Sequence, residues 1–242
     1  MNPTGLAFVQ RALSGLEALG SAQVLEVGAY DYNGSARAAF QGLAVGSYVG
    51  VDIAEGPGVD VVCSVHDLCA RFGPGRFDLV VATELMEHVD DWRNAVRQLK
   101  EVTREGGALI LTTRSRGFPY HGYPYDFWRF EPEDGRRIFA DWDIDLLEAD
   151  PAAPGIFLKA RKAGRPEADL AGIALYSILC GTRKLNHGPG DGDRVARMQE
   201  WERGLIDTPL AHRLYVRFWR RPWRNLEKAV ARTLRGGGGP RP

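Results

Sequence analysis

The stretch QVLEVGAYDYNGS, residues 23–35, decides the fold. The apolar residues on both sides of Glu26 indicate a buried strand, and Gly28 ends that strand at a turn. The segment that follows, SARAAF at residues 35–40, is rich in alanine and indicates a helix. A buried strand, a glycine turn and the start of a helix are typical of the nucleotide-binding corner of a parallel α/β sheet. The sequence therefore predicts a nucleotide-like ligand at this turn.

Short apolar runs alternate with helical patterns as far as residue 162. Strands are predicted at 24–27, 48–52, 60–63, 77–82, 108–112, 144–147 and 156–160, and helices near 35–41, 68–72 and 92–103. This alternation favours a parallel sheet with helices on both faces. Only EADPAAPG, residues 148–155, separates the last two strands, which is too short for a parallel crossover. We therefore predict the α/β class, with a doubly wound, mostly parallel seven-stranded sheet and an antiparallel edge hairpin.

Charge is distributed unevenly along the 242 residues, although the formal net charge is zero. Residues 1–164 carry 16 Lys and Arg against 23 Asp and Glu, whereas residues 165–242 carry 15 against 8. The pattern also changes after residue 164, from alternating strands and helices to helical segments. We predict a ligand-binding Rossmann-like domain at 1–164, a basic helical extension at 165–234 and a disordered tail at 235–242.

The cysteines and the N-terminal segment indicate a reducing compartment. Cys63, Cys69 and Cys180 are too few and too scattered for a disulfide framework or a zinc cluster. Residues 1–20 carry apolar side chains at helical spacing, which indicates an amphipathic helix and not a signal peptide. No segment of the sequence is long and apolar enough to cross a bilayer. The prediction is a cytoplasmic protein.

The turn at Gly28 does not match a dinucleotide-binding loop. The fingerprint G-x-G-x-x-G needs a second glycine two residues on, where this sequence has Tyr30. Glu26 would repel a pyrophosphate, which disfavours NAD, and would suit a ligand with positive charge. Asp52 and Asp67 follow the next two strands, placed to bind ribose hydroxyls and an adenine amine. S-adenosylmethionine (SAM) carries adenosine at one end and a cationic amino acid at the other, and so satisfies all three acids.

Residues 22–162 resemble the class I SAM-dependent methyltransferases of the small-molecule type. The resemblance rests on LEVGAYDYNG (25–34), GVDI (50–53), HDL (66–68), GRFDLVVATELMEHVDDW (75–92) and LKEVTREGGALILTT (99–113). It implies that Glu26 and Gly28 lie by the methionine part, Asp52 by the ribose and Asp67 by the adenine. The cofactor-binding residues predicted in this way are Glu26, Gly28, Ala29, Asp52, Ile53, Asp67, Leu68, Thr83 and Glu84. Tyr30 departs from the family, which usually has glycine there.

The segment ELMEH, residues 84–88, places Glu84, Glu87 and His88 at helical spacing. On a helix, all three side chains would share one face. Two carboxylates and an imidazole can bind Mn²⁺ or Mg²⁺, with His121 as a fourth ligand. The pattern also resembles methyltransferases of the ubiquinone pathway and small-RNA 2′-O-methyltransferases, some of which place a metal there. In metal-free relatives the same residues border the SAM pocket. We predict a metal-free site and keep the metal as the alternative.

The segment RSRGFPYHGYPYDFWRF, residues 114–130, is an aromatic loop after the fifth strand. Its prolines and glycines exclude a regular helix or a central strand. Related methyltransferases use this region to form the acceptor site. The predicted packing residues are Phe127, Trp128 and Phe130, and the predicted substrate contacts are Tyr120, Tyr123 and Tyr125. A hydroxyl acceptor must lose a proton, and His121, followed by His88, is the predicted catalytic base.

The basic, aromatic segment 210–234 leaves three interpretations open. It can pack on the core or form a homodimer, lie on a membrane surface, or bind RNA. Our main prediction for the protein is a methyltransferase that uses SAM and modifies an oxygen, or less readily a nitrogen, of a small acceptor. A sugar-bearing or secondary-metabolite acceptor would suit the tyrosines, and nucleic acid is not the expected partner. The alternatives are an RNA 2′-O-methyltransferase with a metal at Glu84, Glu87 and His88, and a binding protein without catalysis.

Overall fold

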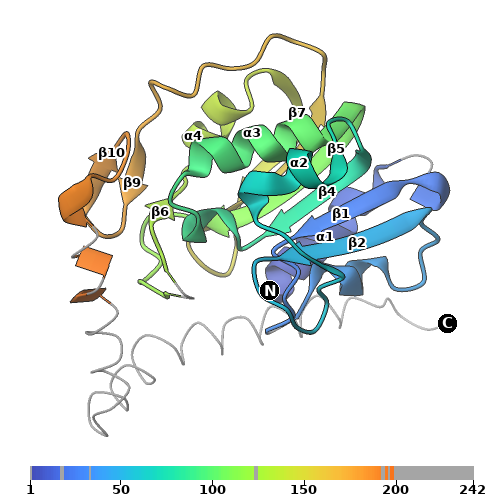
Figure 1. Ribbon diagram of the computed structural model, residues 1–242, viewed down its shortest axis with the longest axis horizontal. Coiled ribbons are helices and arrows are strands. Elements are labelled where there is room, and N and C mark those ends of the chain that lie inside the picture. The colour runs from blue at the N-terminus through green and yellow to red at the C-terminus, as the bar shows by residue number, and fades with distance from the viewer. Residues whose placement is uncertain are drawn as a thin grey trace, which may run out of the picture.

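The computed structural model describes residues 2–16, 19–32, 34–122, 125–191, 194, 195, 197 and 198. Its centre is a seven-stranded sheet in the order β3-β2-β1-β4-β5-β8-β7 (Figure 1). The strands are β1 (Gln23–Val27), β2 (Ser47–Asp52), β3 (Val61–Val62), β4 (Phe77–Thr83), β5 (Thr103–Arg114), β7 (Trp142–Ala149) and β8 (Gly155–Lys162). The first five strands pair in parallel, and β8 runs antiparallel to both β5 and β7. The predicted fold class and the antiparallel edge hairpin are confirmed.

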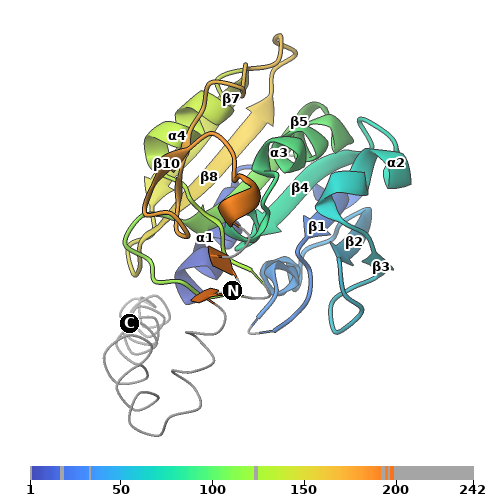
Figure 2. The same ribbon diagram turned by 60° about the vertical axis from the view of Figure 1, so that its left-hand side comes forward.

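Helices cover both faces of the sheet, because successive side chains of a strand point to opposite faces. On one face, α1 (Pro3–Ser14) and the 3₁₀ turn Ala36–Phe40 pack on apolar residues that include Val24 and Val81. On the other face, α2 (Leu68–Phe72), α3 (Trp92–Val102) and α4 (Pro132–Ile138) pack on the alternate residues, such as Leu25 and Val80 (Figures 1 and 2). Further 3₁₀ turns span Leu19–Ser21, Val65–Asp67, Met86–His88 and Pro189–Asp191.

The parallel register brings three chain segments to one edge of the sheet. Val27 pairs with Ala82, and Thr83 pairs with Thr112, so β1, β4 and β5 end side by side. Ligands of open parallel sheets bind outside these carboxyl ends. The segments that follow β1, β4 and β5 are therefore the ones that build the candidate site.

The predicted helical extension is wrong over residues 175–184. Residues 175–184 contain two short strands, β9 (Leu175–Ser177) and β10 (Thr182–Lys184), which form a second sheet with β6 (Trp128–Arg129). Leu170, Ile173 and Leu175 join the core cluster of the main sheet, so the hydrophobic core continues past residue 164. Burial of these apolar residues makes the packing against the main sheet more favourable than a separate helix. Residues 199–234 and the predicted tail lie outside the described residues.

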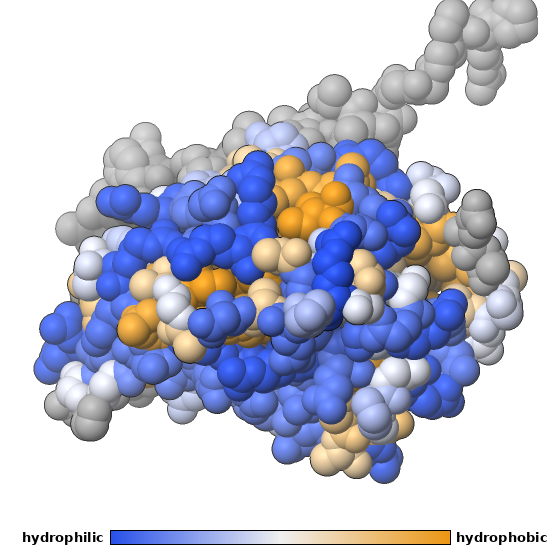
Figure 3. All heavy atoms as spheres, turned by 90° about the horizontal axis from the view of Figure 1, so that it is seen from above, coloured by the Kyte–Doolittle hydropathy of each residue, from blue (hydrophilic) through white to orange (hydrophobic). Residues whose placement is uncertain are grey.

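The surface seen from above Figure 1 is largely hydrophilic, with apolar side chains gathered in limited patches (Figure 3). None of the helices in the described part of the chain has the length and apolar character to cross a membrane.

Candidate active site

Gly28 forms the turn that ends β1. Its φ of +80° lies in the region that favours glycine, and its N–H donates to the Val51 carbonyl at 2.9 Å. A Cβ added to Gly28 would lie 3.4 Å from Cδ1 of Leu85, in the segment after β4. The turn is half-buried, and Ala29 behind it is only 1% exposed. The turn therefore adjoins the ELMEH segment, and Ala29 has no surface for the ligand contact that we predicted.

Glu26 anchors the loop after β1 through buried hydrogen bonds. Its side chain is 1% exposed and accepts hydrogen bonds from the Ser35 hydroxyl at 3.0 Å, the Ala36 N–H at 2.9 Å and the Tyr48 hydroxyl at 2.7 Å. Burial raises the pKa of Glu26, although these hydrogen bonds oppose the shift. The alternation of β1 turns Glu26 to the face covered by α1, where its hydrogen bonds position the loop. Its contact with the methionine part stays a prediction.

Asp52 ends β2, and Asp67 lies directly before α2, as the sequence predicts. The Asp52 carboxylate accepts backbone N–H groups from Tyr30 and Ala54, each at 3.2 Å. Asp67 is exposed and makes no capping hydrogen bond, and Ile53 is 64% exposed. These three side chains are open to a ligand, and their contacts with ribose and adenine stay predictions. Leu68 is different, since it is fully buried in the core and cannot contact a ligand directly.

Tyr30 lies against the loop that follows β2. A Cβ added to Gly56 would come within 2.3 Å of its ring, and the Asp31 N–H donates to the Pro57 carbonyl at 2.8 Å. The loop after β1 and the loop after β2 therefore pack together beside Asp52. The tyrosine that departs from the family pattern has a packing role in this pair of loops.

The ELMEH segment is not a continuous α-helix, so the predicted common face is wrong. Glu84 has a φ of +53°, the one positive φ among the described non-glycine residues, and a 3₁₀ turn begins only at Met86. Glu84 turns toward β5, where it accepts a hydrogen bond from the Thr112 hydroxyl at 2.9 Å and pairs with Arg114. Burial raises the pKa of Glu84, and the Arg114 guanidinium opposes that shift. Thr83 is nearly buried beside it, at 8% exposed.

Glu87 is fully buried and carries an oxygen without a hydrogen-bond partner. The Thr113 hydroxyl donates to its Oε2 at 2.8 Å, but its Oε1 accepts no hydrogen bond from the described residues. Nε2 of His88 lies 3.9 Å from Oε1, and Nε2 of His121 lies 3.8 Å from it. Burial alone would raise the pKa of Glu87, but the imidazoles of His121 and His88 outweigh it and lower the pKa to about 2. An ionised, incompletely bonded oxygen inside the protein marks a place for a ligand.

His88 turns its Nε2 toward this oxygen. Its Nδ1 lies 2.5 Å from the carbonyl oxygen of Tyr125. Since a carbonyl can only accept, Nδ1 carries a proton, and in the neutral ring the lone pair therefore lies on Nε2. In that form Nε2 can accept a proton or bind a cation.

His121 is held by a buried ion pair. Its Nδ1 lies 2.9 Å from the Asp126 carboxylate, and Arg129 donates to both oxygens of that carboxylate, at 2.5 and 2.7 Å. Burial alone would lower the pKa of His121, but Asp126 and Glu87 outweigh it and raise the pKa to about 9. Arg129 and His121 hold the pKa of Asp126 well below its usual range, despite its burial. At neutral pH His121 keeps its proton, so His88 is the better placed base.

Glu87, His88 and His121 also fit a divalent cation. Each offers one ligand atom, and the three atoms lie within 4.8 Å of one another. A cation at about 2.1–2.3 Å from its ligands keeps neighbouring ligand atoms roughly 3–3.5 Å apart, so small movements would close this set. The carbonyl behind His88 and the carboxylate behind His121 are partners that orient metal-binding histidines. Glu84, the remaining residue of the predicted ligand set, is instead engaged by Thr112 and Arg114.

Some side chains of the aromatic loop, residues 114–130, are buried in the core, and others are exposed. Trp128 is fully buried, Phe130 is 4% exposed and Phe127 packs against the core, as predicted for all three. Tyr125 is 43% exposed and stays a candidate for acceptor contact, whereas Tyr120 is 4% exposed and belongs to the interior. Tyr123, the third predicted contact, lies outside the described residues.

Several residues that organise the site were not found from the sequence. Thr112, Thr113 and Arg114 at the end of β5 hold the two glutamates, and Asp126 and Arg129 hold His121. The residues at the end of β5 could have been found by pairing the two predicted strands in parallel, because this register sets Thr83 beside Thr112. The pair Asp126 and Arg129 had no signal beyond opposite charges at a spacing of three.

Comparison with known proteins identifies the family. A family model described as a methyltransferase domain matches residues 6–148. The chain belongs to this family, the SAM-dependent methyltransferases. SAM is the cofactor of the class. The contacts of Asp52 with its ribose and of Gly28 with its methionine part stay predictions.

Individual relatives share part of their length with this chain. A ubiquinone biosynthesis O-methyltransferase of Chromobacterium violaceum is 30% identical over 130 residues, covering 48% of this chain and 53% of the relative. One of the same name from Idiomarina loihiensis is 29% identical over 129 residues, covering 48% and 51%. The chain thus spans about half the length of these curated relatives. A Burkholderia thailandensis 1,6-didemethyltoxoflavin-N1-methyltransferase, solved with S-adenosylhomocysteine (SAH), shares the fold at 19% identity with a TM-score of 0.50, covering 66% and 76%.

Proposed function

We propose that this chain transfers the methyl group of SAM to a hydroxyl oxygen of a small acceptor. The observation that carries the proposal is the cluster of Glu87, His88 and His121, in which a buried carboxylate oxygen accepts no hydrogen bond from the described residues. Glu87 and His88 belong to the segment next to the Gly28 turn. The O-methyltransferase relatives support oxygen as the acceptor atom. The N-methyltransferase with the same fold keeps nitrogen as the second candidate.

The cluster has the chemistry that a hydroxyl acceptor needs. Methyl transfer from a sulfonium is an in-line displacement with a good leaving group, so alignment and exclusion of water are the main requirements. A neutral hydroxyl must also lose its proton as the new C–O bond forms. The lone pair of His88 Nε2 can accept that proton, and the ionised Glu87 beside it stabilises the imidazolium that results.

A divalent cation is compatible with the same proposal. Glu87, His88 and His121 would hold it, and the cation would polarise the acceptor hydroxyl and lower its pKa. Whether or not a cation is bound, Asp126 and Arg129 fix the ring of His121, and the Tyr125 carbonyl fixes that of His88. In both cases the protein therefore holds the two imidazole rings in fixed orientations.

The other predicted features of the protein belong to the same proposal. Asp52 and Asp67 are proposed to bind the adenosine part of SAM, and Tyr125 to contact the acceptor. A cytoplasmic location and a role in small-molecule biosynthesis stay predictions.

The experiment is an acceptor screen with isotopically labelled SAM. Phenols, catechols and sugar hydroxyls are each paired with the matching amine, and every reaction is run with Mn²⁺ and with a chelator. We expect hydroxyl acceptors to be methylated and the amines not, and we expect His88→Gln to remove most of the turnover. His66→Gln is the matched control, since His66 is a half-buried histidine that contacts Asn94 outside the cluster. Methylation of the amines alone would contradict the proposal.

A further inference from the structure

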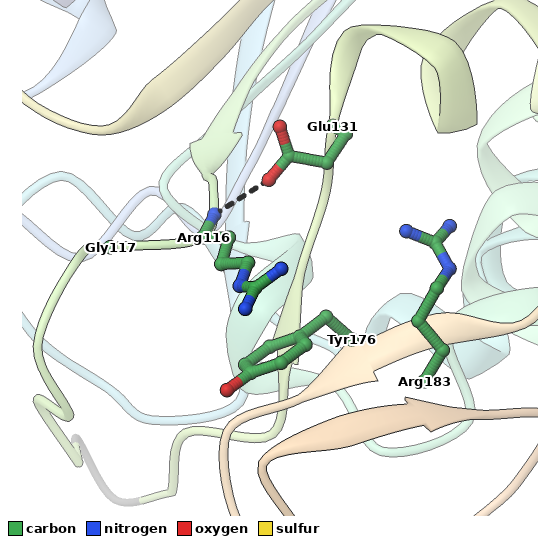
Figure 4. Close-up of a pocket in the computed structure, with 5 residues that line it drawn as sticks. All are labelled: Arg116, Gly117, Glu131, Tyr176 and Arg183. Atoms are coloured by element: carbon green, nitrogen blue, oxygen red, sulfur yellow. Dashed lines mark hydrogen bonds between the residues drawn. The ribbon is translucent and has the colours of Figure 1, made fainter.

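A cavity of about 510 Å³ lies outside the Glu87–His88–His121 cluster (Figure 4). Its lining residues are Arg116, Gly117, Glu131, Tyr176 and Arg183. They come from the loop after β5, the residue before α4, and strands β9 and β10. Four separate chain segments therefore bring two arginines, one acid and one aromatic ring to a single hollow, which neither the SAM site nor the cluster uses.

Arg116 is a cation without a counter-ion among the described residues. Its guanidinium carbon lies 5.1 Å from the centre of the Tyr176 ring, and Figure 4 shows the two side chains facing each other in the cavity. Its backbone N–H donates to Oε1 of Glu131 at 2.9 Å, which fixes the base of the side chain. The guanidinium forms no ion pair with a described acid. Contact with an aromatic face orients an arginine and leaves its N–H groups available for an anion.

Arg183 is a second cation, fixed in its orientation from behind. Its Nε donates to the Ala174 carbonyl at 3.0 Å, and its Nη2 pairs with Asp134, whose side chain is buried. The Asp134 carboxylate also accepts the backbone N–H of Glu131 at 2.9 Å. Because a guanidinium has five N–H donors, the Nη1 group of Arg183 still has two donors that no described residue uses.

Glu131 limits the kind of anion that the cavity can hold. One of its oxygens accepts the Arg116 backbone N–H, and the carboxylate also accepts the backbone N–H of Asp134 in the capping box of α4. Its negative charge would repel an oxyanion placed next to it. The walls of the cavity therefore favour an oxyanion that lies against the arginines and away from Glu131.

The cavity is connected to the methyl-transfer cluster through the same loop and the same small sheet. Arg116 and His121 lie on one loop, and Phe118 between them packs against His121 with ring centres 4.9 Å apart. Tyr176 pairs in β9 with Arg129 in β6, the residue that holds Asp126 behind His121. A ligand bound at Arg116 is thus held by the elements that orient the histidine.

We infer that this cavity binds a carboxylate or phosphoryl group of the methyl acceptor. The inference rests on the proposed function, and it adds the substrate class: hydroxylated acids or phosphate esters. The arginine forks provide bidentate recognition of either oxyanion.

The test is calorimetric titration of the full chain with two probes, inorganic phosphate and benzoate, at low ionic strength. Wild type should bind at least one probe, and Arg116→Gln should weaken that binding by about tenfold or more, since a charge-assisted contact is lost. Arg76→Gln is the matched control, because Arg76 is also exposed and lies over an aromatic ring, that of Phe77, at the start of β4. Preference for benzoate or for phosphate tells the two oxyanions apart. Equal affinity of wild type and Arg116→Gln, or no binding by wild type, would overturn the inference.

Two further readouts separate this inference from the proposed function. SAH binding is measured on the same samples, and it should be unchanged in Arg116→Gln. With a hydroxyl acceptor that also carries a carboxylate or a phosphate group, Arg116→Gln should raise KM by about tenfold while kcat changes little. Probe binding without any methyl transfer would count against the proposed function alone. Normal methyl transfer with an unchanged KM would count against the cavity alone.

Discussion

The two halves of the site are built in different ways. On the cofactor side, Asp52 is held by backbone N–H groups of Tyr30 and Ala54, which come from the loops after β1 and β2. On the acceptor side, His121 depends on the buried pair Asp126 and Arg129. The acids of the cofactor side thus lie on loops and are reached by solvent, whereas the charges of the acceptor side are buried and compensate one another. Substitution of these acids should therefore lower ligand affinity, and substitution of the buried charges should lower stability.

The largest effect is expected from Asp126→Ala. The substitution leaves the fully buried Arg129 guanidinium without its counter-ion, and removing one partner of a buried pair costs about 3–5 kcal/mol. The measurement is the free energy of unfolding by urea. Glu133→Ala is the control, because its pair with Arg136 is exposed on both sides and should contribute less than about 1 kcal/mol. Similar losses of unfolding free energy in the two variants would show that the buried pair is no more stabilising than the exposed one.

The next effect is expected from Glu26→Ala, at the base of the cofactor loop. Three donors, from Ser35, Ala36 and Tyr48, lose their common acceptor, which should cost roughly 2–3 kcal/mol. SAH affinity should fall as well, because the loop after β1 loses its support. A variant with normal stability but no SAH binding would instead restore Glu26 as a direct ligand contact, as the sequence had suggested.

A smaller effect is expected from Gly28→Ala. Alanine at a φ of +80° is strained by about 1–2 kcal/mol, and its Cβ would be in van der Waals contact with Leu85. Gly20→Ala is the matched control, since a Cβ there meets nothing within 4 Å. Thermal melts of both variants, with and without SAH, make the measurement. An unchanged response to SAH in Gly28→Ala would mean that the turn does not form the cofactor site.

The smallest effect on stability is expected from Asp52→Ala. Its hydrogen bonds are exposed, so the unfolding free energy should change by no more than about 0.5 kcal/mol. Its effect on the cofactor should be large by contrast. SAH at about 100 times its Kd stabilises a protein by roughly 2.7 kcal/mol, and this variant should lose most of that gain. Glu55→Ala, a neighbouring exposed acid, should keep it.

The same contrast explains what could be predicted from the sequence. The sheet follows from apolar alternation, and the acids at 52 and 67 follow from strand ends, because both signals lie within a few residues. The burial of Glu26 and its hydrogen bond from Tyr48 could not be predicted, because they depend on the face to which β1 turns the side chain and on the pairing of β1 with β2. The ELMEH segment was misassigned because Glu84 adopts a positive φ that its pairing with Arg114 compensates. The strands β9 and β10 replaced the predicted helix because they pair with β6, far away in the sequence.

The most direct test of the central claim is methyl transfer by Glu87→Gln. Glutamine keeps the shape of the side chain but removes the charge that faces His88 and His121. We expect the SAH affinity of Glu87→Gln to stay within about twofold of wild type, which shows an intact fold, while kcat for a hydroxyl acceptor falls by on the order of a hundredfold. Equal kcat in wild type and Glu87→Gln would show that the cluster takes no part in the reaction.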